Sequence, residues 1–152
     1  MTSENPHRIE ISDQQQHSLD FEDCTKVARM IVDDFGFDQS EISIAFVDDP
    51  AIRDLNKQYL NHDYETDVIS FVLEESETSL TGQLLVSTDT AVKMGQQIGV
   101  PTEHEVLLYV IHGMLHLVGF DDTDPESAEK MRAAEADYLD RFGIKHHWEP
   151  SQ

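Results

Sequence analysis

The sequence predicts a single α+β domain in which a mixed sheet of about four strands packs against about five helices. Three observations support this prediction. The chain has 152 residues, a length typical of one domain that can bury roughly two-thirds of its unfolded surface. Short segments with alternating or dense apolar residues favour strands, and longer segments with apolar residues three or four apart favour helices. The two kinds of segment follow one another in a mixed order.

Four segments are predicted to be strands: residues 8–12, 41–47, 67–73 and 82–87. In the second, Ile42, Ile44 and Phe46 alternate with polar or small residues, so one face is expected to be buried. The third is dense in Val, Ile and Phe, which favours a strand covered on both faces. The run EESETS, residues 74–79, is predicted to be a solvated loop.

Five helices are predicted from apolar periodicity and from residues that cap helix ends. They are expected to begin at Asp20, at Asp48 or Asp49, at Thr88 or Asp89, at Glu103, and at Asp124 or Pro125. The fourth helix is the most apolar and runs to about Val118, where Gly119 is a suitable C-terminal cap. The last ends at Gly143, so the core spans about residues 8–143 and residues 144–152 are predicted to form a tail.

The composition bounds the functional classes. There are 31 acidic and 10 basic residues, and the formal net charge of −21 argues against broad electrostatic binding to nucleic acid. No run of about eighteen apolar residues predicts a membrane span, and the N-terminus lacks the pattern of a signal peptide. The single cysteine, Cys24, is expected to be a buried core thiol. We therefore expect a cytoplasmic protein.

The stretch HGMLHLVGFDD, residues 112–122, is the clearest candidate for a metal site. His112 and His116 stand four apart on the fourth predicted helix, so their Cβ atoms should lie about 6 Å apart on one face. Two such imidazoles can bind one cation, and the turn after the helix can bring Asp121 or Asp122 back as an oxygen ligand. A water bound at a coordination position of the cation that the protein leaves open would have a lowered pKa.

Two other interpretations of this stretch were weighed. Metalloproteases of the HExxH type place glutamate directly after the first histidine as general base, but Gly113 occupies that position here. The protease class is therefore disfavoured. The remaining alternative is that the two histidines are ordinary core or surface imidazoles, because pairs at this spacing also arise by chance.

HGMLHLVGFDD resembles the HGxLHLxGyDH motif of the YbeY-type family, the metal-dependent single-strand endoribonucleases of rRNA maturation. LNKQYLNHDYETDVISF, residues 55–71, is similar to the family's LNxxYRxxDxPTDVLSF block. GQLLVSTDTA, residues 82–91, is similar to its GDIxISxxxA block, and Glu105 and EKMRAAE, residues 129–135, also fit. The resemblance covers roughly residues 40–140 in the family's order, and ordered blocks are more specific than one motif.

The resemblance implies one zinc ion per chain, held by three histidines in a cleft that receives RNA. His112 and His116 match two of these ligands, but Asp122 stands where the family has the third histidine. Carboxylate is an acceptable zinc ligand, so we expect Asp122 to supply the third donor, with Mn²⁺ or another divalent ion as the alternative metal. Leu60 replaces an arginine thought to serve the RNA phosphate; His62 is the nearest substitute, unless it is a solvated loop residue.

Other residues are weaker candidates. His62 and Asp121 are the catalytic candidates, although neither has a secure role. Candidate residues of the cleft wall are Asn56, Tyr59, Asp67 and Ser70, for which hydrogen bonding within the fold is the alternative. The histidines of HHW, residues 146–148, resemble a metal-binding segment, but a disordered tail is the favoured interpretation.

By resemblance, we expect a metal-dependent endoribonuclease that acts near the 3′ end of the small-subunit rRNA and in ribosome quality control, with water or the RNA 2′-hydroxyl as nucleophile. Expected partners are rRNA and the small ribosomal subunit, together with partner proteins that deliver the substrate; no membrane and no DNA are expected. One alternative is a non-catalytic ribosome-assembly factor that has kept the fold. Another is a metal-dependent hydrolase with a different substrate.

Overall fold

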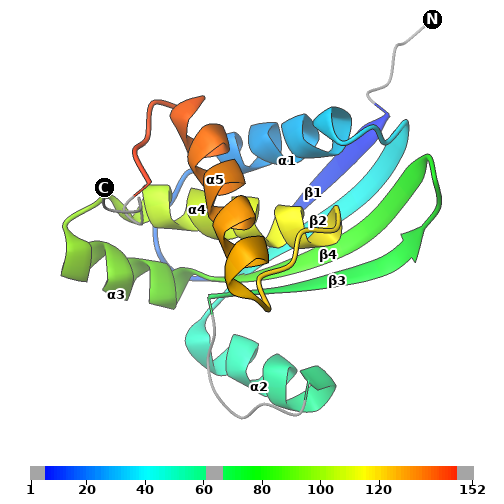
Figure 1. Cartoon of the computed structure of the whole chain (residues 1–152). Helices are drawn as coiled ribbons and strands as arrows, with labels where there is room; N and C mark the ends of the chain where they lie inside the picture. Colours follow the sequence, from blue (N-terminus) through cyan, green and yellow to red (C-terminus); the bar gives the residue numbers. More distant parts are fainter. Residues whose placement is uncertain (1–5, 61–66, 147–152) are drawn as a thin grey trace, which may run out of the picture.

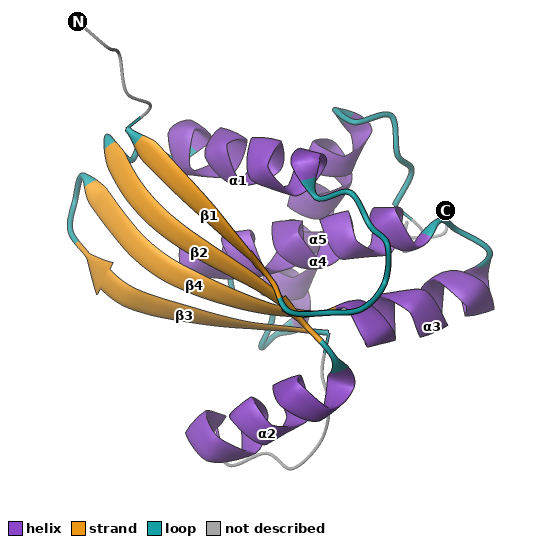
Figure 2. Ribbon diagram, turned by 180° about the vertical axis from the view of Figure 1, so that it is seen from behind, coloured by secondary structure: helices purple, strands orange, loops and turns teal. Residues whose placement is uncertain are grey.

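The computed structural model describes residues 6–60 and 67–146. Its single sheet has four strands, which are β1 (His7–Asp13), β2 (Gln39–Val47), β3 (Val68–Glu75) and β4 (Ser79–Ser87). They lie in the order β1-β2-β4-β3 (Figure 2). β1 and β4 pair with β2 in parallel, whereas β3 pairs with β4 antiparallel. The prediction of a mixed sheet in an α+β domain is therefore confirmed.

Five helices complete the described part of the chain, namely α1 (Glu22–Asp34), α2 (Asp49–Leu60), α3 (Thr88–Ile98), α4 (Thr102–Leu117) and α5 (Pro125–Asp140). Figure 1 shows α1, α4 and α5 on one side of the sheet and α2 on the other. None of the helices within residues 6–60 and 67–146 is both long and apolar enough to cross a membrane.

The core is built around α4, which contacts α1, α3, α5 and the strands β3 and β4. This helix is apolar on nearly all sides, as expected for a helix enclosed by other elements. Met114 and Leu115, which lie between the two histidines in the sequence, are fully buried in the main core. A Cβ atom at Gly113 would lie 2.8 Å from Leu84 Cδ2, so glycine lets α4 approach the sheet closely. The histidine-bearing turn of α4 is thus held against a rigid support.

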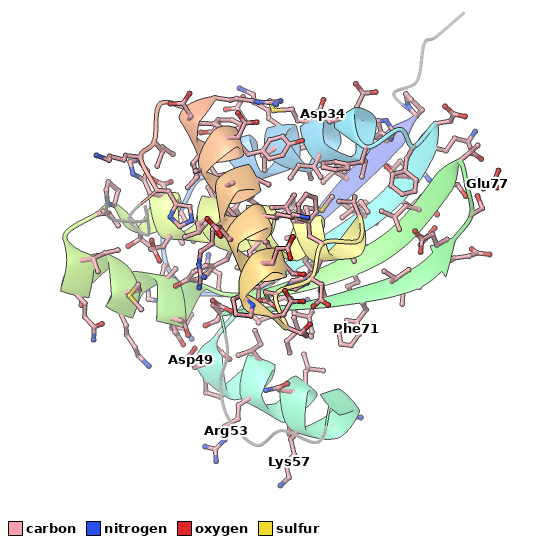
Figure 3. All side chains as sticks on the ribbon, in the orientation of Figure 1. Asp34, Asp49, Arg53, Lys57, Phe71 and Glu77 are labelled. Atoms are coloured by element: carbon pink, nitrogen blue, oxygen red, sulfur yellow. The ribbon has the colours of Figure 1, made fainter. Side chains whose placement is uncertain are left out.

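A second, smaller core lies between α2 and the other face of the sheet, and includes Val47, Ile52, Ile69 and Leu85. Phe71 of β3 packs against it on the α2 side (Figure 3). The prediction that residues 67–73 are covered on both faces is wrong for the far end of β3. Leu73 is 62% exposed there.

Several predicted boundaries also need correction. Within EESETS, only residues 76–78 lie outside the strands, since β3 runs to Glu75 and β4 begins at Ser79. Asp20 does not occupy the N-cap of α1, although its carboxylate accepts a hydrogen bond from the Glu22 backbone. α3 begins at Thr88, as predicted, and Ser87 is its N-cap. Asp124 caps α5 as predicted, and its side chain accepts from the Ser127 backbone.

Candidate metal centre

Three side chains that could bind a metal ion converge at the end of α4. The Nε2 atoms of His112 and His116 lie 3.2 Å apart. Asp122 lies in the loop that joins α4 to α5, and its Oδ2 atom is 3.7 Å from both of these nitrogens. Gly119 makes this return of the chain feasible, because its φ of 111° lies in a region that residues with a side chain rarely adopt. The structure thus brings together the two predicted histidines and the predicted aspartate.

The spacing of these three atoms suits a small divalent cation. They form a triangle with sides of 3.2, 3.7 and 3.7 Å. The point equidistant from its corners lies about 2.05 Å from each, which matches the bond lengths of roughly 2.0–2.2 Å between small divalent cations and nitrogen or oxygen ligands. The cluster could therefore hold a metal ion.

The partners of the two rings determine where their lone pairs point. His116 Nδ1 lies 3.1 Å from the Phe120 carbonyl oxygen, which can only accept, so this nitrogen carries the proton. His112 Nδ1 lies 2.6 Å from a carboxylate oxygen of Glu135 and donates in the same way. In the neutral rings both Nε2 lone pairs therefore face each other, which is repulsive unless a cation or a proton lies between them. Ring nitrogens held by such partners are typical of histidine ligands.

Glu135 is the residue on which this arrangement depends and that the sequence did not single out. It lies on α5 and is 5% exposed, and it also accepts a hydrogen bond from His146 at 2.8 Å. Burial raises the pKa of Glu135, but the hydrogen bonds from His112 and His146 outweigh it and lower the pKa to about 2. For His112, burial lowers the pKa, but the hydrogen bond and the charge of Glu135 outweigh burial, so the pKa of His112 is raised. Two sequence signals pointed to Glu135: the match of EKMRAAE to a family block, and its position four residues from both Met131 and Leu139 on the buried face of α5.

His146 itself contradicts the predicted tail. Its side chain is buried against Glu135, so the interpretation of His146 as part of a disordered tail is wrong. The remaining residues of that prediction, 147–152, lie outside the described residues.

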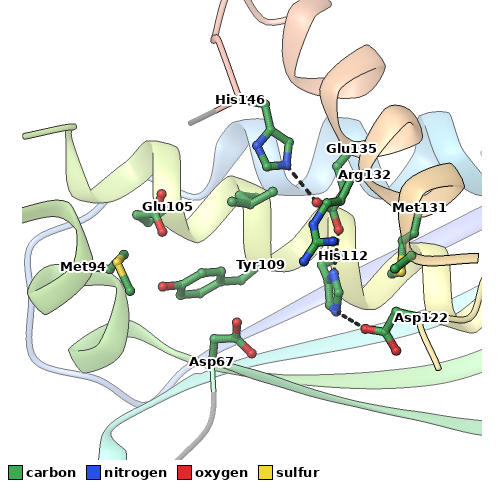
Figure 4. Close-up of a pocket in the computed structure, with 12 residues that line it drawn as sticks. Asp67, Met94, Glu105, Tyr109, His112, Asp122, Met131, Arg132, Glu135 and His146 are labelled. Carbon is green, nitrogen blue, oxygen red and sulfur yellow. Dashed lines mark hydrogen bonds and ion pairs between the residues drawn. The ribbon is translucent and has the colours of Figure 1, made fainter. Parts of the chain in front are cut away.

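A cavity of about 190 Å³ opens beside the candidate ligands. Figure 4 shows it between α4, α5 and the start of β3. Its walls include the apolar side chains of Met94, Leu108 and Met131. Acidic groups on its lining are Asp67, Glu105, Asp122 and Glu135, and Arg132 is the single Lys or Arg among the described residues that line it. The cavity could accept a group with an apolar face that also carries hydrogen-bond donors.

Glu105 and Tyr109 form the end of the cavity away from Asp122 (Figure 4). They stand four apart on α4, and both are buried. Burial and then the neighbouring Glu105 charge raise the pKa of Tyr109, whose hydroxyl donates a hydrogen bond to Glu105. The Tyr109 hydroxyl therefore remains protonated at neutral pH.

The weaker candidates are placed as follows. Asp67 lines the cavity, and its carboxylate accepts a hydrogen bond from the Val68 backbone. Asn56 is buried on α2, on the opposite side of the sheet, and Ser70 of β3 does not line the cavity. The Asp121 carboxylate accepts hydrogen bonds from Thr123 and is not part of the cluster. His62 lies outside the described residues, as do the side chains of Tyr59 and Leu60.

The fold is thus an α+β domain in which a His/His/Asp cluster that could hold a metal ion lies beside a cavity. The comparisons with known proteins identify the family. The model of the endoribonuclease YbeY family matches residues 8–143. The chain therefore belongs to the YbeY endoribonuclease family, a family of hydrolases acting on RNA.

Individual relatives agree with this assignment. The endoribonuclease YbeY of Salinibacter ruber is 36% identical over 148 residues, which cover 91% of this chain and 94% of that protein. The YbeY of Bacteroides fragilis is 42% identical over 95 residues, covering 62% of this chain and 68% of that protein. The solution structure of a protein from Thermotoga maritima aligns with a TM-score of 0.60 at 24% identity, covering 89% and 91% of the two chains, and supports the fold alone.

Proposed function

We propose that this protein is a metal-dependent endoribonuclease that cleaves single-stranded rRNA, near the 3′ end of the small-subunit rRNA. One zinc ion per chain would be held by His112, His116 and Asp122, with Mn²⁺ as the alternative ion. The observation that carries the proposal is the convergence of these three donor atoms, at 3.2 and 3.7 Å, beside a cavity. Membership of an endoribonuclease family supplies the substrate class.

The residues around the proposed metal site have different roles in this function. A bound zinc ion supplies a Lewis acid that can polarise a phosphate oxygen or acidify water. Glu135 and the Phe120 carbonyl oxygen keep the Nε2 atoms of the two histidines turned toward the site. Arg132 is the cationic side chain of the cavity lining among the described residues, and we assign to it the contact with a phosphate group of the RNA.

The acidic character of the chain affects how RNA would reach the site. With a formal net charge of −21, the protein as a whole repels a polyanion. We therefore infer that the small ribosomal subunit or a partner protein presents the strand, in the cytoplasm, rather than that free RNA is captured by long-range attraction. A single strand suits this cavity, because an unpaired base can leave its stack and enter it.

The first test is metal content per chain in protein purified without chelators. Wild type should hold about one zinc or manganese ion, and His116→Ala and Asp122→Ala should lose it. Asp121→Ala is the matched control, because this neighbouring carboxylate is bonded to Thr123 instead of the cluster. Absence of metal from the wild type, even after zinc is added, would refute the metal-dependent mechanism.

A second candidate function is favoured by one observation. Four acidic side chains and one arginine line the cavity, which disfavours a bound phosphate. A ribosome-assembly factor without cleavage activity would fit this balance. Cleavage of single-stranded RNA by metal-loaded wild type, lost in His116→Ala, would exclude it; ribosome association without cleavage would establish it.

A further inference from the structure

We infer that His146 is a positioning residue of the metal centre, which fixes Glu135 so that Glu135 in turn orients His112. The three side chains form one hydrogen-bonded chain. His146 Nε2 lies 2.8 Å from Glu135 Oε1, and Glu135 Oε2 lies 2.6 Å from His112 Nδ1 (Figure 4). The far nitrogen of His112 is the one that faces His116 and Asp122. This inference rests on the proposed metal site and not on RNA cleavage.

The two oxygens of the Glu135 carboxylate accept hydrogen bonds from different imidazoles, those of His146 and His112. A carboxylate bonded at one oxygen can still rotate about its last torsion, which is broad in energy. A donor on each oxygen fixes the plane of the group and hence the direction of the bond to His112. The side chains of His146 and Glu135 are 3% and 6% exposed, so water is poorly placed to replace the His146 donor.

The backbone after α5 explains how His146 reaches this position. The chain reverses at Gly143, whose φ is 74°, and the Ile144 backbone N–H then donates to the Leu139 carbonyl oxygen at 3.0 Å. The Ile144 side chain packs against the main core. These contacts anchor the segment on α5, so His146 is delivered to Glu135 by local structure and also becomes part of the cavity wall.

The role requires only a hydrogen-bond donor of suitable length at position 146. Because a carboxylate oxygen can only accept, His146 Nε2 must carry the proton. A glutamine amide can also donate to Glu135, whereas leucine fills similar space without a donor. Partners of this kind typically change metal affinity by about 10–100-fold when removed.

The test compares His146→Gln and His146→Leu in the full chain, with Lys145→Ala, at the exposed neighbouring position, as control. Zinc affinity is measured by competition with a chromophoric chelator, and the His112 Nδ1–H resonance is followed by NMR in the metal-free protein. We expect His146→Leu to weaken zinc binding by about 10–100-fold and to shift or broaden that resonance. His146→Gln should restore both, and Lys145→Ala should change neither.

Wild-type affinity and an unchanged His112 resonance in folded His146→Leu would overturn the inference, as would failure of the wild type to bind zinc. If His146→Leu does not fold, the same measurements on His146→Met decide, because this flexible apolar side chain can fill the space of the ring without donating to Glu135. Zinc binding that follows this pattern in a protein that cuts no RNA would support the inference and refute only the proposed cleavage.

Discussion

Replacing Asp49 with asparagine tests how α2 is attached to the rest of the domain. Asp49 is the first residue of α2, and its side chain is 12% exposed. Its carboxylate accepts hydrogen bonds from the Ser87 hydroxyl, from the Thr90 hydroxyl at 2.8 Å and from Lys93 Nζ at 2.7 Å. These donors belong to the end of β4 and to α3, so one carboxylate joins three elements.

The pKa of Asp49 gives the direction of the effect. Burial raises this pKa, but the hydrogen bonds from Lys93, Ser87 and Thr90 outweigh it, so the folded-state pKa is lowered. A lowered folded pKa means that the ionised carboxylate stabilises the fold above the unfolded pKa of about 3.9. This contribution is lost as the pH falls through the folded value.

Asparagine keeps one acceptor oxygen but places an amide among three donors and loses the charge. A hydrogen bond to a charged group contributes about 1.5–3 kcal/mol, and Lys93 is largely exposed, so we expect a loss of about 2 kcal/mol at pH 7. For a domain of this size, that corresponds to a Tm lower by about 4–8 °C. At pH 3 the difference from wild type should shrink.

Urea denaturation of metal-free protein at pH 7 and pH 3 measures this difference directly. Asp54→Asn, on an exposed position of the same helix, is the control and should change the free energy of unfolding by less than about 0.5 kcal/mol. An Asp49→Asn variant that loses equal stability at both pH values, or no more than Asp54→Asn at pH 7, would refute the reasoning.

Three further predictions concern the metal, the cavity and the packing of α4. Zinc at about 100 times its dissociation constant should stabilise the wild type by about 2.7 kcal/mol, which raises Tm by about 5–10 °C in a thermal scan. His116→Ala should show no such rise, and a chelator should reverse the rise in the wild type. Arg132→Gln should raise the KM for a single-stranded RNA about tenfold or more with zinc affinity unchanged; an unaltered KM would remove Arg132 from the substrate site. Gly113→Ala should destabilise the fold by about 1–2 kcal/mol, because the new methyl group would meet Leu84 and Val68 at 2.8 and 3.0 Å, and a raised Tm would show that the core adapts.

The local features of the site could be predicted because they depend on helix geometry and a short turn. His112 and His116 stand four residues apart on a strongly apolar helix, and helix geometry alone places residues at this spacing on one face. Gly119 indicated where the helix ends, and the few residues to Asp122 limit how far the chain can travel. The same reasoning could not choose between Asp121 and Asp122, which the hydrogen bonds of the Thr123 turn decide.

The contacts that orient the site could not be predicted, because they join segments that are distant in sequence. Glu135 lies 23 residues from His112. Its spacing from Met131 and Leu139 places it on the buried face of α5, but this spacing does not tell which side chain it meets there. His146 follows a helix-ending glycine, and a short polar segment there is typical of a tail. The exposed end of β3 was missed for a related reason: which elements cover a strand's faces is not encoded in the strand's own residues.

The proposed metal site combines two carboxylates, those of Asp122 and Glu135. A divalent cation at the three donor atoms would have the Asp122 carboxylate as a ligand and the Glu135 carboxylate bonded to His112, so two negative charges balance its own. The two histidines are each fixed by a hydrogen-bond acceptor, whereas the Asp122 side chain is 45% exposed. At the proposed metal site, the pair of imidazoles would set the geometry and Asp122 would adjust to the ion.

An anionic carboxylate donates more charge to a metal ion than a neutral imidazole does, so the ion would polarise a bound water less. This water should therefore ionise at a higher pH than in a site with three histidines. A pH–rate profile that rises at higher pH in wild type than in Asp122→His would bear this out, and identical profiles would show that Asp122 does not bind the ion.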